Sequence, residues 1–210
     1  MKILLAGATG LVGGHALRQL LADPACSAVI APTRRALDRA HPKLHNPVLD
    51  FDALPAQAPW WQVDAAICAL GTTMRQAGSR EAFRRVDHDY PLAIARLLRQ
   101  HGAAAFALNS ALGANPQSWA FYNRVKGDLE HDLRALGFPS LTLVRPGLIG
   151  GERAQRRRGE HAASVVLRAL GPLLPRRYRI NPAERIAAAL VASALQPRPG
   201  VQVIEAAQLV

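Results

Sequence analysis

The sequence has few cysteines and aromatic residues and no long apolar run. Only 2 of the 210 residues are cysteines, Cys26 and Cys68, so neither a disulfide framework nor a cysteine-based metal motif is present. The 7 histidines are scattered, and we predict no metal site. No stretch of about 18 apolar residues occurs, so we expect no membrane span. Glycines interrupt the apolar N-terminus, which is not typical of a signal peptide, and we therefore expect a cytoplasmic protein.

Acidic residues are also scarce relative to basic ones. The chain has 26 lysines and arginines against 15 aspartates and glutamates, a net charge of +11. Such an excess can indicate a nucleic-acid partner. Here the arginines are spread through an alanine-rich chain, and few aromatic residues lie among them to stack on bases. Nucleic-acid binding is therefore the last of three alternatives, and one globular domain is expected from the length and apolar content.

The N-terminal stretch carries the strongest pattern. Lys2–Ala6 is typical of a short buried strand, glycines follow at positions 7, 10 and 13, and a helical pattern begins at Leu11. A helix start offers unpaired N–H groups and a partial positive charge, and glycines let a pyrophosphate approach the backbone. The pattern predicts a dinucleotide site, with these cofactor candidates: Gly7, Thr9, Gly10, Leu11, Val12 and Gly13.

The end of the second predicted strand, Ser27–Ala31, lacks an acid. An aspartate or glutamate about 20 residues past the glycines would bind the ribose 2′-hydroxyl of NAD. Arg34 and Arg35 stand there instead, and a guanidinium favours the 2′-phosphate of NADP. The alternative is a solvated basic turn. A third, weak strand over Pro47–Phe51 makes Asp50 a further cofactor candidate near the adenine.

Small polar residues follow two later apolar runs. Val63–Leu70 is a strong buried strand, and Ala103–Leu108 is another, followed by Asn109 and Ser110. Ligands bind beyond the carboxyl ends of strands in open parallel sheets. The first of these strand ends predicts cofactor contacts from Leu70, Gly71, Thr72 and Thr73.

Strand-like and helix-like segments alternate along the chain. A helical pattern covers Arg80–Gln100, where Pro91 either kinks the middle or marks a start. Further strands are expected over Leu141–Arg145 and Val201–Glu205, and helices over 162–170 and 183–195, the last begun by Pro182. This alternation predicts an α/β fold with a parallel sheet and right-handed crossovers.

Tyr122 and Lys126 lie four residues apart and so share one helix face. A phenol is a poor acid or base at neutral pH, but a fixed cation beside it stabilises the phenolate and lowers its pKa. Tyr122 could then exchange a proton with a carbonyl or alcohol, and Ser110 could bond the same substrate oxygen. The alternative is a surface lysine over a half-buried tyrosine.

Together these motifs resemble the short-chain dehydrogenases/reductases of the atypical or extended type, and more closely their TIP30/CC3-like branch. The resemblance covers nearly the whole chain. The family pattern rests on Gly7-x-x-Gly10-x-x-Gly13, Asn109-Ser110, Tyr122-x-x-x-Lys126 and Arg145-Pro146-Gly147. The stretches similar to the branch are Cys68–Thr73, Arg85–Tyr90, Gly113–Ala114, Tyr122–Gly127 and Val144–Gly147.

The resemblance implies a Rossmann-type doubly wound parallel sheet in three layers, formed by a single domain over 1–210 that binds NADP(H), with NAD as the less favoured cofactor. Residues 1–147 would form the cofactor-binding core, and 148–210 a short substrate-side extension with a small or open pocket. Ser110 would polarise the substrate carbonyl, Tyr122 would be the acid/base, and Lys126 would bind the nicotinamide ribose. Pro146 and Gly147 would contact the nicotinamide.

Two functional hypotheses follow. The first is an NADP-dependent oxidoreductase acting on a small carbonyl or alcohol, as a monomer or homodimer. The second is an NADP(H)-binding redox sensor or scaffold without turnover. The basic segments 153–158 and 176–179 are expected to be solvated surface, and the alternative for 153–158 is a lid or a patch for an acidic partner.

Overall fold

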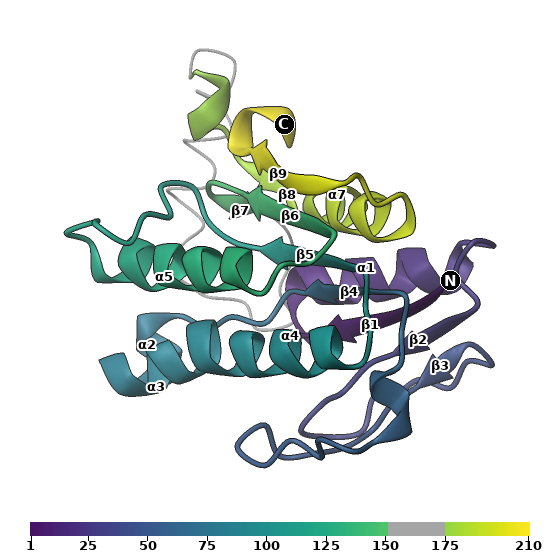
Figure 1. The fold of residues 1–210 in the computed structure, drawn as a ribbon. Coiled ribbons are helices and arrows are strands. Elements are labelled where there is room, and N and C mark those ends of the chain that lie inside the picture. The colour runs from purple at the N-terminus through teal and green to yellow at the C-terminus, as the bar shows by residue number, and fades with distance from the viewer. Residues whose placement is uncertain (151–174) are drawn as a thin grey trace.

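The computed structural model describes residues 1–150 and 175–210. A seven-stranded parallel sheet lies between two layers of helices (Figure 1). This is the predicted three-layer Rossmann-type fold. The sheet strands are β1 (Lys2–Ala6), β2 (Ala28–Ile30), β3 (Leu44–His45), β4 (Ala65–Cys68), β5 (Ala105–Asn109), β6 (Ser140–Arg145) and β9 (Gly200–Glu205).

The strand order β3-β2-β1-β4-β5-β6-β9 places a topological switch between β1 and β4. The chain winds outward in one direction from β1 and in the other from β4, so the connections after these two strands leave on opposite sides of the sheet. In register, Ile3 pairs with Ala65 and Ala6 with Cys68. Ligands bind beyond the carboxyl ends of strands at such a switch.

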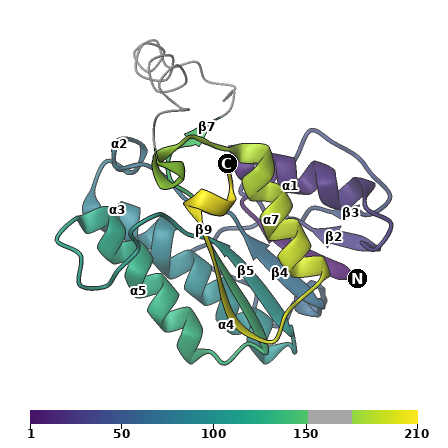
Figure 2. The same ribbon diagram turned by 90° about the horizontal axis from the view of Figure 1, so that it is seen from above.

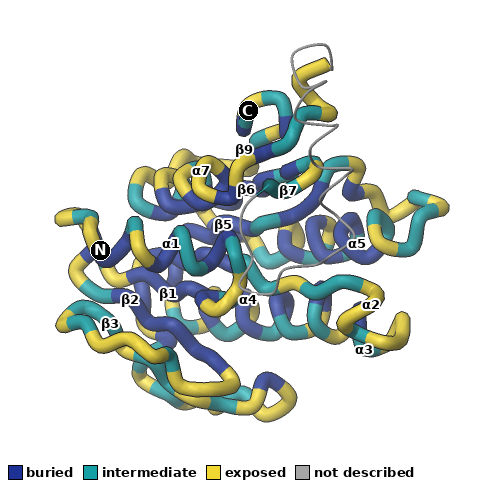
Figure 3. Tube along the Cα trace, turned by 180° about the vertical axis from the view of Figure 1, so that it is seen from behind, coloured by how far each residue is buried: buried dark blue, intermediate teal, exposed yellow. Residues whose placement is uncertain are grey.

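Helices cover both faces of the sheet (Figure 2). On one face, α1 (Leu11–Ala22) and α7 (Ala183–Leu195) bury Leu17, Leu20 and Ile186. On the other face, α4 (Tyr90–Gln100) and α5 (Phe121–Ala135) bury an apolar layer with members such as Leu98 and Leu129. Figure 3 shows the inner strands as the most buried part of the trace. Each such side chain stabilises the fold by about 1.5–3 kcal/mol through burial.

The predicted helix over Arg80–Gln100 is divided. Short α2 (Met74–Ala77) precedes α3 (Arg80–Arg84), and the π-helical segment η2 (Arg85–Asp89) joins α3 to α4. The Tyr90 N–H donates to the Arg85 carbonyl, which widens the turn directly before Pro91. Pro91 lacks a backbone N–H and is tolerated in the first turn of a helix, so it marks a start.

The third predicted strand, Pro47–Phe51, is wrong in position. The structure pairs Leu44–His45 with β2, and only an isolated bridge joins Val48 to Thr33. Two prolines, Pro42 and Pro47, bracket the segment and limit it to a short edge strand.

Residues 175–210 contribute the strand β9 and the helix α7 to the main fold. α7 begins at Ala183, as predicted, and Pro182 is its N-cap rather than its first helical residue. β7 (Ile149–Gly150) pairs with β8 (Asn181–Pro182), and short 3-10 turns occur at η1 (Pro59–Trp61), η4 (Arg176–Tyr178) and η5 (Ala206–Gln208). The predicted helix over 162–170 and the basic segment 153–158 lie outside the described residues.

Candidate active site

The glycine turn connects β1 directly to the start of α1. Gly7 has φ +90°, which only glycine adopts readily, and the Gly10 N–H donates to the Gly7 carbonyl at 2.9 Å. A Cβ on Gly13 would lie 2.0 Å from the Gly7 oxygen, so helix and turn can approach only without a side chain there. The free N–H groups of the first turn of α1 therefore face the end of the sheet, as an anion site requires.

One cleft of about 1080 Å³ extends from this turn to the first turn of α5. The predicted cofactor and catalytic residues that line it are Thr9, Gly10, Leu11, Val12, Leu70, Gly71, Thr72, Thr73, Ser110, Tyr122 and Lys126. Gly7 and Gly13 shape the turn without lining the cleft. The cleft thus joins the glycine turn to the tyrosine-lysine pair, and segments far apart in sequence meet at the switch between β1 and β4.

The two arginines predicted to contact the cofactor lie outside the cleft lining. Arg34 and Arg35 are exposed and do not line the cleft, whereas Arg18, Asp38 and Arg39 do. The loop after β2 reaches the cleft at residues 37–39 rather than at 34–35. The Asn46 amide donates to the Ala31 carbonyl and to Thr33 Oγ1, and its oxygen accepts from the Leu37 N–H at 2.8 Å. These bonds hold the 37–39 stretch at the cleft wall.

Asp50 also stays outside the cleft. Its carboxylate accepts from the Asp52 backbone N–H at 2.9 Å and closes a local turn. Pro146 and Gly147 do not line the cleft either. The buried Asn181 accepts from the Gly147 N–H at 2.7 Å and donates to the Ala206 carbonyl at 2.8 Å, which ties this loop to the C-terminal segment. Ile149, two residues further on, lines the cleft in their place.

Lys126 is paired with a carboxylate that sequence analysis missed. Its Nζ lies 2.8 Å from Asp87 Oδ1, and both side chains are almost completely buried. The other Asp87 oxygen accepts from the Thr72 N–H at 2.7 Å. A signal was present in the sequence, because Asp87 occupies the apolar stripe of its helical pattern, four residues after the buried Phe83.

The surroundings of Tyr122 raise the pKa of its hydroxyl overall, although Lys126 lowers it as expected from the sequence. Burial contributes most to the increase, Lys126 opposes it, and Asp87 adds to it. For Lys126, burial lowers the pKa, but the attraction of Asp87 and Tyr122 outweighs that cost and leaves it raised. The cation therefore stays charged, while Asp87 opposes its effect on the phenol.

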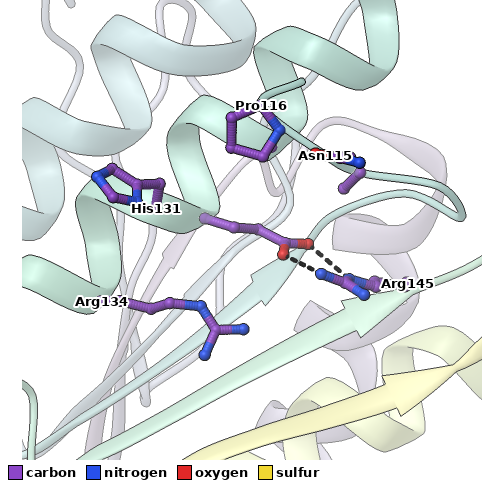
Figure 4. Close-up of a pocket in the computed structure, with 8 residues that line it drawn as sticks. Asn115, Pro116, His131, Arg134 and Arg145 are labelled. Atoms are coloured by element: carbon purple, nitrogen blue, oxygen red, sulfur yellow. Dashed lines mark hydrogen bonds and ion pairs between the residues drawn. The ribbon is translucent and has the colours of Figure 1, made fainter. Parts of the chain in front are cut away.

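Ser110 is buried at the end of β5, and its hydroxyl is already engaged. It donates to Glu130 Oε1 at 2.5 Å. Glu130 in turn accepts from Arg145 through both oxygens, at 2.9 and 2.5 Å. Glu130 and Arg145 line a smaller pocket of about 340 Å³, together with His131 and Arg134. Figure 4 shows Arg145, His131 and Arg134 around this pocket, with dashed lines that end on the Arg145 side chain. Ser110 therefore connects the main cleft to a second polar site.

Asn109, beside Ser110, lines the main cleft and has a buried Oδ1 without a hydrogen-bond partner among the described residues. Such an atom is costly to leave unpaired. A bound group with an N–H donor would satisfy it, and the glycine turn leaves room for a phosphate. The residues present therefore fit a nicotinamide dinucleotide.

Within residues 1–150 and 175–210, no group of three or more potential metal ligands gathers. Over the same ranges, no helix is long and apolar enough to cross a bilayer.

No family model matches the chain. It is similar to the protein fmp52, mitochondrial, of Emericella nidulans, with 34% identity over 179 residues that cover 81% of this chain and 76% of the relative. It is also similar to the protein HTATIP2 of Rattus norvegicus, with 36% identity over 166 residues that cover 77% and 68% of the two chains. FMP52 of Meyerozyma guilliermondii is 31% identical over 206 residues, which are 94% of this chain and 87% of that protein.

Solved structures share the fold at low sequence identity. MoeE5 in complex with UDP-glucose and NAD has a TM-score of 0.74 and 16% identity, with 97% of this chain and 75% of MoeE5 covered. The PhqB reductase domain from Penicillium fellutanum has a TM-score of 0.68 and 22% identity, with 97% and 66% covered.

The expectation of a cytoplasmic protein is wrong, because several of the relatives are named as mitochondrial proteins. The identities and coverage show the family: the chain belongs to the atypical short-chain dehydrogenases/reductases, NAD(P)-binding Rossmann proteins, in the branch that contains FMP52 and HTATIP2.

Proposed function

We propose that the chain binds NADP(H) in the main cleft and transfers a hydride to or from a small carbonyl or alcohol. One observation carries this proposal. A single cleft has the glycine turn at one end and Tyr122 and Lys126 at the other end. An anion site and a proton-transfer group at the two ends of one cleft match the two ends of a dinucleotide. Residues 1–147 would hold the cofactor, and 148–210 would complete the substrate side.

The chain's own residues divide the work along the cleft. The free N–H groups at the start of α1 would bind the pyrophosphate. Arg39 and Arg18 would bind the 2′-phosphate, with Arg34 and Arg35 adding positive charge at the rim. When bound, the reduced cofactor supplies the hydride.

At the other end, Lys126 would bind the nicotinamide ribose, and the Leu70–Thr73 stretch would contact the same part of the cofactor. The Asn109 oxygen would accept an N–H from the bound group. Tyr122 would give a proton to the substrate oxygen during reduction or take it back during oxidation. Ser110 would bind the same oxygen after its hydroxyl turns from Glu130 toward the cleft.

The test is a fluorescence titration with NADPH and NADH, followed by an assay of NADPH oxidation on a panel of aldehydes and ketones. We expect saturable NADPH binding, and turnover that Tyr122→Phe reduces by at least tenfold. A protein without affinity for either dinucleotide would contradict the proposal.

A second candidate is an NADP(H)-binding sensor or scaffold without turnover. Two contacts favour it: the Ser110 hydroxyl is committed to Glu130, and Asp87 compensates the charge of Lys126. Cofactor binding combined with no Tyr122-dependent turnover on any panel member would favour this candidate. A change in partner binding between NADPH and NADP⁺ would then identify it as a sensor.

A further inference from the structure

The charge of Lys126 is balanced from a different segment of the chain. Lys126 comes from the second turn of α5, and Asp87 comes from the π-helical segment η2. Their ion pair spans 2.8 Å, and the two side chains are 4% and 1% exposed. Breaking a buried pair leaves an uncompensated charge in a poorly solvated site, so the two residues act as a unit.

Asp87 is fixed at both oxygens. The Thr72 N–H donates to Oδ2 at 2.7 Å, while Oδ1 binds the lysine. Gly71 lies against the pair, and a Cβ there would come within 3.3 Å of Asp87 Oδ1. The strand end therefore reaches the carboxylate because residue 71 has no side chain. These contacts hold the Asp87 carboxylate in place, and the carboxylate in turn holds the Lys126 amine.

The other charged groups nearby have partners of their own. His88 contacts Asp89 at 2.8 Å and Asp132 at 3.0 Å. Arg84 contacts Asp128 on α5 at 2.9 Å. From β4, the buried Cys68 adds only a thiol, whose pKa burial raises to about 11.

The charge that Tyr122 experiences is therefore set mainly by two groups of opposite sign, Lys126 and Asp87. An unpaired lysine one helical turn away would favour the phenolate. The Asp87 carboxylate opposes that effect.

We propose that Asp87 is a positioning residue that fixes Lys126 and opposes its charge, so that Tyr122 serves as a proton donor and the site is suited to carbonyl reduction. This rests on the proposed function for its reaction. In reduction, the phenol O–H bond breaks as an O–H bond forms on the substrate oxygen, while the carbonyl carbon receives the hydride of the reduced dinucleotide. The phenolate is then reprotonated from water. Alcohol oxidation needs the phenolate first, and Asp87 disfavours it.

The experiment is an alkaline absorbance titration of tyrosine in the full chain without cofactor. The chain has 3 tyrosines, and subtraction of the Tyr122→Phe curve isolates the signal of Tyr122. In Asp87→Asn, the lysine charge loses its counter-ion, and the midpoint of Tyr122 is expected to move to lower pH. In Lys126→Met, the carboxylate remains alone, and the midpoint is expected to move to higher pH. The double variant is expected to return close to wild type.

A purely structural role of Asp87 cannot shift the Tyr122 midpoint in opposite directions in the two single variants. The proposal would be overturned if the Tyr122 midpoint shifted in the same direction in both single variants, or if it did not shift in either folded variant. If Asp87→Asn does not fold, as judged by circular dichroism, Lys126→Met and the double variant still decide the question, because the Tyr122 midpoint of the double variant must lie at lower pH than that of Lys126→Met.

NADPH binding to wild type is measured in parallel. Shifted midpoints without NADPH affinity would remove the proposed function and leave the Asp87–Lys126 coupling intact, whereas NADPH binding with unshifted midpoints would do the reverse.

Discussion

The Ser110 hydroxyl lies 2.5 Å from Glu130 Oε1 and donates a hydrogen bond to it, in the buried wall between the cleft and the smaller pocket. We predict that Glu130→Gln lowers the free energy of unfolding by about 3 kcal/mol, because it leaves Arg145 without its buried counter-ion. Urea unfolding measures the loss. Glu205→Gln is the matched control: Glu205 contacts the same arginine at 3.2 Å but is half exposed, and its loss should cost less than about 1 kcal/mol. Equal losses in the two variants would contradict this account.

Gly127 permits a close contact between α5 and the loop before it. A Cβ on Gly127 would lie 2.2 Å from the Asn115 carbonyl carbon, and backbone cannot move aside cheaply. We predict that Gly127→Ala destabilises the protein by about 1–3 kcal/mol in urea unfolding. Gly14→Ala is the matched helical control, since its Cβ would meet Ala8 at an ordinary 3.7 Å and alanine favours helix, so stability should hold or rise. An unchanged free energy of unfolding in Gly127→Ala would contradict the prediction, because it would mean that the loop at Asn115 moves aside for the added methyl group.

The selectivity for NADPH over NADH should depend on Arg39. We predict that Arg39→Ala raises the Kd for NADPH about tenfold, because a charge-assisted bond to the 2′-phosphate is lost, and leaves the Kd for NADH nearly unchanged. Fluorescence titration with both cofactors measures this. Arg96→Ala, an exposed arginine of α4 outside the cleft, is the control and should change neither value.

The double replacement of Arg34 and Arg35 by alanine compares these two arginines, which lie outside the cleft lining, with Arg39, which lines it. We expect a smaller loss of NADPH affinity than in Arg39→Ala, since these two arginines do not line the cleft. A larger loss would return the 2′-phosphate to the position expected from sequence. Equal weakening of NADPH and NADH binding in both Arg39→Ala and the Arg34/Arg35 double variant would remove the 2′-phosphate assignment.

Cys68 should make stability depend on alkaline pH. Burial raises the pKa of its thiol from an ordinary 9.0 to about 11, so the folded state retains a proton that the unfolded state releases. The contribution is therefore complete below about pH 9 and is lost as pH rises toward 11. Its size is on the order of 2–3 kcal/mol. Unfolding free energies of wild type and Cys68→Ala, compared at pH 8 and pH 10.5, measure it; parallel pH profiles would contradict the prediction.

Local patterns predict the parts of this protein that are formed locally. The glycines at 7, 10 and 13 determine a turn within one strand–helix unit, and Tyr122 and Lys126 share a face because they lie on one helix. The alternation of strand and helix patterns is enough for the three-layer fold, since parallel strands need crossovers.

The remainder depends on side chains that meet across long stretches of chain. Asn46 positions the 37–39 stretch through bonds to residues 9 to 15 positions away, and this places Arg39 rather than Arg34 at the cleft. Glu130 engages Ser110, which is 20 residues away. Periodicity gives the face on which a residue lies but not its partner, so the compensated charge of Lys126 was not predictable from the tyrosine-lysine spacing.

The contact between α1 and α7 has a consequence for the order in which the protein folds. The apolar side of α1 packs against a helix that begins at Ala183, far along the chain. Contacts between residues so distant in sequence form slowly, because the long intervening segment loses conformational entropy before the contact stabilises it. We therefore expect this helix layer to assemble late in folding, after the local strand–turn–helix unit that carries the glycines.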